Sequence, residues 1–526
     1  MNIIIIGGGT AGWMAAGFLK KKNPSYDVTV IESPDIPKIG VGETVTPHVA
    51  AFFDELGISA KDWMLATGSV YKFANKFIDW KKDSEYFSFA YPTSVDRLYR
   101  DIEHPTTFDD LKCEGPRTVD AMLDLYKQGR IGKFDKYFNP QFHYMEKNVA
   151  PFEGNQYLLN PLYSWTQHIN AELAANYIRD VVSIPLGVKH IQAKVEDVWH
   201  DGDVVSRIDL DNGATVRADL FVDASGFSGV LVNKLKRERK YYSTVCNAAW
   251  VCQIDYNDPD VEMVNYTTTT AQDYGWSFNI GLYHRMGAGY IFSTDYATSD
   301  KAFETYSNII GNNNKRRTPR LIQWTPQRLN EAGKGNVAAI GLSCGFVEPM
   351  EANALYIIIN SIRKLNNVLE IYKQTKQFNF KQYNEHLAYA TDDIADFVKV
   401  HYTLADKDNS DMWNDMKQLG IRDNHRDLVY SKFMDKRHSM LSAWDGISMF
   451  PDYMWGQFAM SWGLIDDRWK NKPVDATTLG LAELYFKNSE VKHDIISGTR
   501  QNNFQWLKQN IFNGMMPHEW EEAYLG

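Results

Sequence analysis

The feature that most constrains the fold of this chain is a run of glycines close to its N-terminus. Segment 2–6 is dominated by isoleucine, which predicts a strand covered on both faces. Gly7, Gly9 and Gly12 follow at once as a GxGxxG motif, and segment 11–22 is typical of a helix. The motif alone is weak evidence. A strand before it and a helix after it are the context that a dinucleotide-binding turn requires.

Each glycine of the motif has its own physical task. Gly7 makes the tight turn, Gly9 lets the backbone approach a pyrophosphate, and Gly12 permits close packing of helix against strand. The pyrophosphate would then meet free N–H groups and the positive end of the helix. Three neighbouring positions are expected to belong to the same cofactor site: Thr10, Ala11 and Trp13.

An acidic residue ends the second predicted strand, 28–31. Glu32 follows Gly12 by 20 residues, and its carboxylate can accept hydrogen bonds from a ribose diol. The same carboxylate would repel a 2′-phosphate, which disfavours NADP. Strand, glycines, helix and acid together predict an α/β unit that binds a dinucleotide, and a purely structural glycine turn is the weaker alternative.

Two later segments bear on the choice between FAD and NAD. Segment 219–226 (DLFVDASG) and segment 337–342 (VAAIGL) each read as a short buried strand that ends in glycine. Both resemble elements that close on the cofactor in FAD oxidoreductases, so three such strands favour FAD. The residues expected to contribute from these segments, and from a predicted β-meander at 186–211, are Asp223, Ser225, Gly226, Gly341 and Val195.

Composition narrows the class of protein further. The 526 residues suffice for two or three packed regions, and the net charge of −10 argues against binding to nucleic acid or to an anionic membrane surface. The four cysteines have no metal-binding spacing, so we expect a reduced, cytoplasmic protein without a bound metal. The apolar runs are too short to span a bilayer.

The periodicity of the chain changes along its length. Segment 244–295 is rich in Thr, Tyr, Val and Phe at near-alternate spacing, which predicts an antiparallel sheet, whereas the pattern is helical from about residue 354. We therefore predict a mixed α/β fold with a Rossmann-like, FAD-binding body over 1–370. That body would include the inserted sheet, and a helical C-terminal cap would occupy 371–526.

Five segments together resemble the flavin-dependent tryptophan halogenases. They are 7–14 (GGGTAGWM), 40–43 (GVGE), 71–72 (YK) with 76–80 (KFIDW), 223–227 (DASGF) and 344–351 (CGFVEPME). Their order and spacing hold from about residue 1 to 400. The resemblance implies an FAD box of the flavin monooxygenase type that carries a helical region. It adds six residues to the expected cofactor site: Gly40, Val41, Gly42, Glu43, Pro349 and Met350.

The resemblance also implies an activity. Members of the family use FADH2, O2 and chloride or bromide to make hypohalous acid, which travels through an internal tunnel to an aromatic substrate. We expect that substrate to be indole- or tryptophan-like. A separate NADH-dependent flavin reductase is the implied source of FADH2, because the sequence contains no second nucleotide motif. A homodimer is left open.

The catalytic residues of the family fall on Lys72 and Glu351. A buried ammonium at Lys72 would polarise the oxygen–halogen bond, and Glu351 would help to polarise the halogen and accept the proton of the ring. From spacing alone, Lys72 fits a surface lysine and Glu351 fits an acid at a helix start, so both roles depend on the resemblance.

The chain departs from the family pattern directly after Glu351. The family has Ser-Thr-Gly there, and this chain has Ala-Asn-Ala at 352–354. The resemblance implies that halide binds the backbone N–H groups of Asn353 and Ala354, although Ala354 cannot adopt conformations that need glycine. The changed residues therefore fall at the position where the resemblance places the halide.

A second departure concerns the substrate wall. The family signature WxWxIP is replaced by WSFNIG at 276–281, which leaves Trp276 and Phe278 as candidates. Phe87 and Trp455 are further candidates, and ordinary core packing explains all four residues as well. Two alternatives therefore stay open beside the halogenase: a flavin monooxygenase that inserts oxygen, and an FAD-binding protein without halide chemistry.

Overall fold

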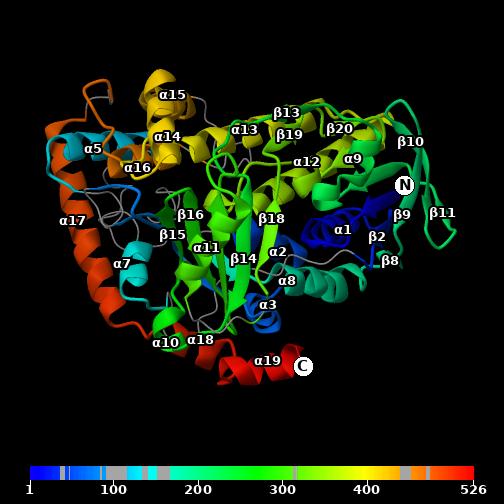
Figure 1. The fold of residues 1–526 in the computed structure, drawn as a ribbon, viewed down its shortest axis with the longest axis horizontal. Coiled ribbons are helices and arrows are strands. Elements are labelled where there is room, and N and C mark those ends of the chain that lie inside the picture. The colour runs from blue at the N-terminus through cyan, green and yellow to red at the C-terminus, as the bar shows by residue number, and fades with distance from the viewer. Residues whose placement is uncertain are drawn as a thin grey trace. The chain divides into compact units, whose positions relative to one another are not determined.

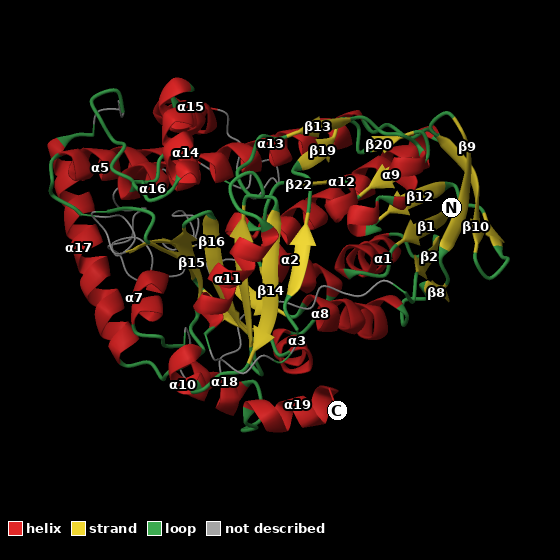
Figure 2. Ribbon diagram, in the orientation of Figure 1, coloured by secondary structure: helices red, strands yellow, loops and turns green. Residues whose placement is uncertain are grey.

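The computed structural model describes residues 1–35, 42–46, 48–82, 86–90, 115–132, 140–150, 166–311, 316, 318–438, 450, 452–469 and 474–525. These residues divide into two compact units, and each unit is built from three separate segments. The first unit comprises Met1–Gly68, Ile169–Asn247 and Ile322–Val398. The second comprises Ser69–His168, Ala248–Leu321 and Lys399–Gly526. The predicted domain boundary at residue 370 stays a prediction. Figures 1 and 2 label the elements.

A six-stranded sheet forms the centre of the first unit. Its strand order is β20–β21–β12–β1–β2–β8, and only the edge strand β20 runs antiparallel to its neighbour. The bounds are β1 (Asn2–Ile6), β2 (Asp27–Glu32), β8 (Lys189–Gln192), β12 (Leu220–Asp223), β20 (Gly333–Lys334) and β21 (Val337–Ala339). The isoleucines of β1 are at most 4% exposed, as expected for a strand covered on both faces.

Helix α1 (Thr10–Lys22) connects β1 to β2, which confirms the predicted strand–helix–strand unit. Its residues from Gly12 to Leu19 are all buried. The helix ends at Lys22, and the side-chain amide of Asn23, which follows it, donates to the Leu19 carbonyl at 3.1 Å. Because Pro24 follows, the helix cannot continue, and the chain turns back into β2.

The remaining elements of the first unit flank this sheet. The meander β9 (Val195–Asp201), β10 (Val204–Leu210) and β11 (Thr215–Val216) confirms the strands predicted near 186–211. A small sheet contains β13 (Arg239–Tyr241), β19 (Gln327–Leu329) and β22 (Gly345–Phe346). The longer helical elements are α2 (His48–Leu56), α3 (Ala60–Thr67), α8 (Ala171–Tyr177), η1 (Ile178–Ser183), α9 (Val230–Lys234) and α12 (Asn353–Thr375). Helix α13 (Lys381–Thr403) continues into the second unit.

The second unit is organised around a seven-stranded sheet in the order β18–β14–β17–β16–β15–β5–β6. Strands β14 (Ala248–Ile254), β15 (Tyr266–Gln272), β16 (Gly275–Gly281) and β17 (Met286–Phe292) confirm the antiparallel sheet predicted over 244–295. The outer strands are β5 (Ala74–Ile78), β6 (Tyr86–Ala90) and β18 (Arg320–Gln323), the last at the unit boundary. Buried and partly buried residues alternate along β15, as expected of a sheet with two different faces.

Helices make up most of the rest of the second unit. They are α5 (Gly115–Lys127), α7 (Pro140–Glu146), α10 (Pro259–Glu262), α11 (Ser299–Ile310), α14 (Asp411–Arg422), α15 (His425–His438), α16 (Asp452–Ser461), α17 (Ala476–Gly498), α18 (Asn503–Asn510) and α19 (Pro517–Leu525). The helical pattern predicted for the C-terminal region is confirmed by α12 to α19. Among the described residues, no helix is long and apolar enough to cross a membrane.

Candidate cofactor and catalytic site

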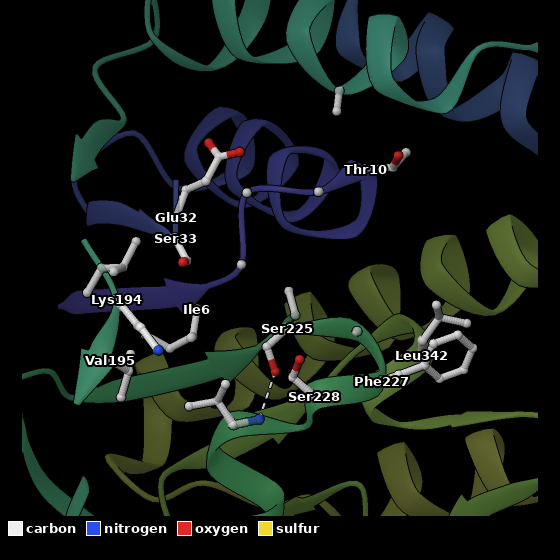
Figure 3. Close-up of a pocket in the computed structure, with 18 of the residues that line it drawn as sticks. Ile6, Thr10, Glu32, Ser33, Lys194, Val195, Ser225, Phe227, Ser228 and Leu342 are labelled. Carbon is white, nitrogen blue, oxygen red and sulfur yellow. Dashed lines mark hydrogen bonds between the residues drawn. The ribbon is translucent and has the colours of Figure 1, made fainter. Parts of the chain in front are cut away.

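A cavity of about 710 Å³ lies in the first unit at the carboxyl ends of β1, β2 and β12 (Figure 3). This edge is where open α/β sheets bind nucleotides, because loops and helix N-termini converge there. Eight of the residues predicted from the sequence line it: Gly7, Gly9, Thr10, Glu32, Glu43, Val195, Ser225 and Gly226. The other lining residues were not predicted as site residues: Ile6, Gly8, Ile31, Ser33, Asp35, Ala171, Glu172, Ala175, Ala193, Lys194, Ala224, Phe227, Ser228, Val230 and Leu342.

The three motif glycines differ in their surroundings. Gly7 has a φ of +117°, and a Cβ there would lie 2.3 Å from the Ala224 carbonyl oxygen. A Cβ on Gly12 would lie 1.9 Å from the carbonyl oxygen of Gly7, so strand and helix pack in direct backbone contact. Gly9 has no atom within 4 Å of its Cβ position and lines the cavity. This open glycine at a helix N-terminus fits a pyrophosphate, so the cavity has the features that FAD requires.

Thr10 lines the cavity, and its hydroxyl donates to the Ala171 carbonyl at 3.1 Å. Three other predicted residues, Ala11, Trp13 and Gly341, do not line it. Trp13 is fully buried. Ala11 packs against Gly341, where a Cβ would lie 3.1 Å from the Ala11 side chain, and Gly341 itself has a φ of +63°. These three residues therefore support the turn without lining the cavity.

Glu32 is the acid expected to contact a ribose, and it ends β2 at the cavity wall. The structure adds a partner that the sequence did not indicate. The Nε2 atom of His190, on the neighbouring strand β8, lies 3.0 Å from Glu32 Oε2. The Glu32 carboxylate is thus held by a second side chain before any ligand is present.

Asp223 was expected to contact the cofactor, but it does not line the cavity. Its carboxylate is fully buried and accepts four hydrogen bonds from the chain itself. The Ser225 amide and hydroxyl donate to Oδ1 at 3.1 and 2.6 Å, and the amides of Leu231 and Val232 donate to Oδ2 at 2.8 and 3.0 Å. Asp223 therefore fixes the 223–226 turn and caps α9, which places Ser225 and Gly226 at the cavity.

Glu43 contributes a carboxyl group to the same cavity. The residue is partly buried, and loss of hydration raises the pKa of its carboxyl to about 7. The preceding Gly42 has a φ of +112°, a conformation that favours glycine. Gly40 and Val41 lie outside the described residues. Glu43 is consequently neutral in a large fraction of molecules at neutral pH.

The segment around Glu351 forms a strained turn ahead of a long buried helix. Glu351 is 4% exposed, with φ 64° and ψ 19°, and Ala352 follows with φ 59° and ψ 35°. Two successive residues other than glycine in the left-handed region cost free energy, and such strain concentrates at functional sites. Pro349 and the buried Met350 lead into this turn and do not line the cavity described above.

Asn353 and Ala354 form the first turn of α12. The side-chain amide of Asn353 donates to the carbonyls of Glu348 and Met350 at 2.8 and 2.7 Å, which closes the strained turn. Ala354 has no positive φ, so the backbone strain lies at Glu351 and Ala352 instead. The missing glycine is therefore not needed at position 354 in this conformation.

Lys72 ends β4 (Val70–Lys72) in the second unit and is fully buried. Strand β7 (Thr166–Ile169) pairs with it antiparallel, with His168 opposite Val70, so the side chains of Lys72 and His168 share one face of the pair. Burial and the Lys72 ammonium lower the pKa of His168 well below its usual value. His168 is thus a neutral neighbour of Lys72, and its Nε2 lies 2.9 Å from the Thr267 hydroxyl.

The predicted aromatic residues all lie in the second unit. Trp276 and Phe278 lie on the same face of β16, with ring centroids 6.0 Å apart and exposures of 3% and 9%. A Cβ on Gly289 would lie 2.3 Å from the Phe278 ring, so that glycine makes room for it. Trp455 is fully buried in α16. Phe87 belongs to β6, and its side chain lies outside the described part of the structure.

Together, the glycine turn, the acid that ends β2 and the cavity at the strand ends define an α/β protein of the kind that binds a dinucleotide. The family model described as tryptophan halogenase matches residues 2–477. The chain therefore belongs to the tryptophan halogenase family, whose members are flavin-dependent enzymes, and FAD is the cofactor that the family implies. The resemblance seen in the sequence is confirmed.

Relatives and solved structures agree with this assignment. The chain is 30% identical to the tryptophan 7-halogenase KtzQ of Kutzneria over 446 residues, which cover 81% of this chain and 80% of that protein. It is also 30% identical to the tryptophan 7-halogenase RebH of Lentzea aerocolonigenes, with 81% of each chain covered. A tryptophan halogenase structure from Shewanella frigidimarina superposes with a TM-score of 0.82 at 23% identity, covering 98% of both chains. The predicted fold class and enzyme class are confirmed.

Proposed function

We propose that this protein uses FADH2, O2 and chloride or bromide to halogenate an indole- or tryptophan-like substrate. The observation that carries the proposal is Lys72, which is fully buried at the position of the family lysine. Lysine is almost never fully buried unless it has a partner or a function. Relatives named as tryptophan 6- and 7-halogenases support an indole ring as the target.

The cofactor would occupy the cavity at the carboxyl ends of β1, β2 and β12. Gly9 and the start of α1 would meet the pyrophosphate, and Glu32 would accept hydrogen bonds from ribose. Ser225 and Gly226 would contact the cofactor from the opposite wall. When bound and reduced, FAD would give two electrons to O2, and the halide would give the other two and become hypohalous acid, while the second oxygen atom leaves as water. A separate NADH-dependent reductase would provide the reduced flavin.

Lys72 would act on hypohalous acid through its charge. Its ammonium would donate a hydrogen bond to the oxygen and so weaken the oxygen–halogen bond, and burial strengthens this effect because water does not screen the charge. The neutral state of His168 supports the role, because a second positive charge on the same face would oppose protonation of the lysine. As the aromatic carbon takes the halogen, the released oxygen leaves as water.

Glu351 would accept the proton that the ring carbon loses. Its strained backbone supports a functional assignment, because relaxed alternatives are available to a glutamate that only caps a helix. Halide would bind the amides of Asn353 and Ala354 at the N-terminus of α12, where the helix dipole favours an anion. Trp276 and Phe278 would form part of the substrate wall.

The proposal is tested by replacing Lys72 with alanine. The matched control is the replacement of Lys76 with alanine. Lys76 lies on β5, is partly buried and pairs with Glu146 at 3.3 Å. With FADH2, O2, bromide and indole supplied, we expect Lys72→Ala to abolish brominated product while FAD binding is unchanged, and Lys76→Ala to retain product. Unchanged product formation by Lys72→Ala would overturn the assignment.

A further inference from the structure

The Glu32 carboxylate is held between the His190 side chain and the backbone of Gly8. Strands β2 and β8 run parallel with Val30 opposite His190, which places the side chains of Glu32 and His190 on the same face. The His190 Nε2 and Glu32 Oε2 are 3.0 Å apart, and both side chains are less than one-fifth exposed. A hydrogen bond from the His190 ring nitrogen to a carboxylate oxygen is stronger than one between two neutral groups.

His190 is in turn fixed by Trp13. The Trp13 ring is fully buried in α1 and contacts the imidazole edge to face, with ring centroids 5.0 Å apart and an interplanar angle of 80°. A buried indole cannot move aside without opening a void in the core, so the imidazole has little freedom to rotate. The orientation of His190 is therefore set by the same helix that begins at the glycine turn.

Gly8 contacts the Glu32 carboxylate as well. A Cβ on this residue would lie 2.1 Å from the Cδ atom and 2.3 Å from Oε2 of Glu32. The carboxylate therefore rests directly against the backbone of the turn, beside the start of α1 (Figure 3). The dinucleotide motif leaves this position open to any residue, and here only glycine leaves room for the carboxylate.

We propose that His190 is a positioning residue that holds the Glu32 carboxylate against Gly8, oriented for the ribose hydroxyls in the adenosine half of FAD. The inference rests on the proposed role of Glu32 in binding that ribose. A carboxylate that is ordered before the ligand arrives loses less conformational freedom on binding. Removing the imidazole should weaken FAD binding by roughly three- to tenfold, the factor expected when one side chain must be ordered by the ligand.

The test is a titration of the apo-protein with FAD, followed by quenching of flavin fluorescence. We expect His190→Leu to weaken FAD binding by the factor above. His190→Gln should restore most of the affinity, because the glutamine amide nitrogen takes the place of Nε2. FMN, which lacks the adenosine, is the matched control ligand and should bind all variants alike. Gly8→Ala should reproduce the selective loss for FAD by displacing the carboxylate.

A double-mutant cycle separates the inference from the role of Glu32. If His190 acts through Glu32, His190→Leu should have no further effect once Glu32→Ala is present. An equal loss for FAD and FMN, or a loss that persists in the Glu32→Ala background, would overturn the positioning role. If Glu32→Ala alone leaves FAD affinity unchanged, the ribose-binding role fails, and the inference fails with it.

Discussion

Replacing Asp223 with asparagine is expected to destabilise the first unit and loosen the cofactor cavity together. The side chain is fully buried, and its two oxygens receive two hydrogen bonds each, from Ser225 and from the amides of Leu231 and Val232. Asparagine has nearly the same shape but only one acceptor oxygen. Whichever way the amide turns, its NH2 group faces donors that have lost their acceptor.

The magnitude follows from the two orphaned donors. A buried donor without a partner costs about 1–3 kcal/mol, so two of them cost about 2–6 kcal/mol. Loss of the negative charge at the N-terminus of α9 adds to this. Because the same turn places Ser225 and Gly226 at the cavity, FAD affinity should fall as well.

Urea unfolding of the apo-protein measures the effect. Asp300→Asn is the control, because Asp300 is exposed in the first turn of α11 and its loss should cost at most about 1 kcal/mol. If Asp223→Asn lowers the free energy of unfolding no more than this control, the four hydrogen bonds do not have the role assigned to them.

Three further changes have defined outcomes. Gly12→Ala should cost about 1–3 kcal/mol in urea unfolding and abolish FAD binding, because its Cβ would overlap the Gly7 carbonyl; wild-type FAD affinity would contradict this. Glu43 has a pKa of about 7 when folded against 4.5 otherwise, so the apo-protein should lose stability as pH rises from about 4.5 to 7. Glu43→Gln should remove about 1–2 kcal/mol of this pH-dependent loss of stability, a range that allows for solvent screening of a partly exposed group. If the stability of Glu43→Gln depends on pH as that of the wild type does, the assigned role of Glu43 is wrong. Ala352→Gly should stabilise the protein by about 1 kcal/mol in the same unfolding measurement, because the residue is left-handed; a loss of stability would argue against strain there.

The spacing of apolar residues along the sequence predicted the individual strands and helices. The βαβ unit of 2–32 and the antiparallel strands of 244–295 follow from side-chain periodicity, which directly reflects which face is buried. The three-segment construction of each unit could not be predicted in this way. It depends on contacts between residues hundreds of positions apart, for which a single sequence carries no periodic signal.

In the site, too, residues within one short motif could be predicted, and residues brought together by strand pairing could not. Gly7, Gly9 and Glu32 were identified because their spacing is fixed by one short turn. His190 and His168 were missed, because each matters only through the register of a neighbouring strand. Asp223 was recognised as important, but its hydrogen bonds to α9 show that it shapes the cavity from within the chain.

Halogenation itself is tested most directly by the mass spectrum of the product formed from indole with FADH2, O2 and bromide. We expect a product with the near-equal isotope pair of one bromine, formed only with bromide and absent with Lys72→Ala. A hydroxylated product without bromine would identify a monooxygenase and overturn the proposed halogenation. Absence of any product from FAD-loaded protein would overturn it as well.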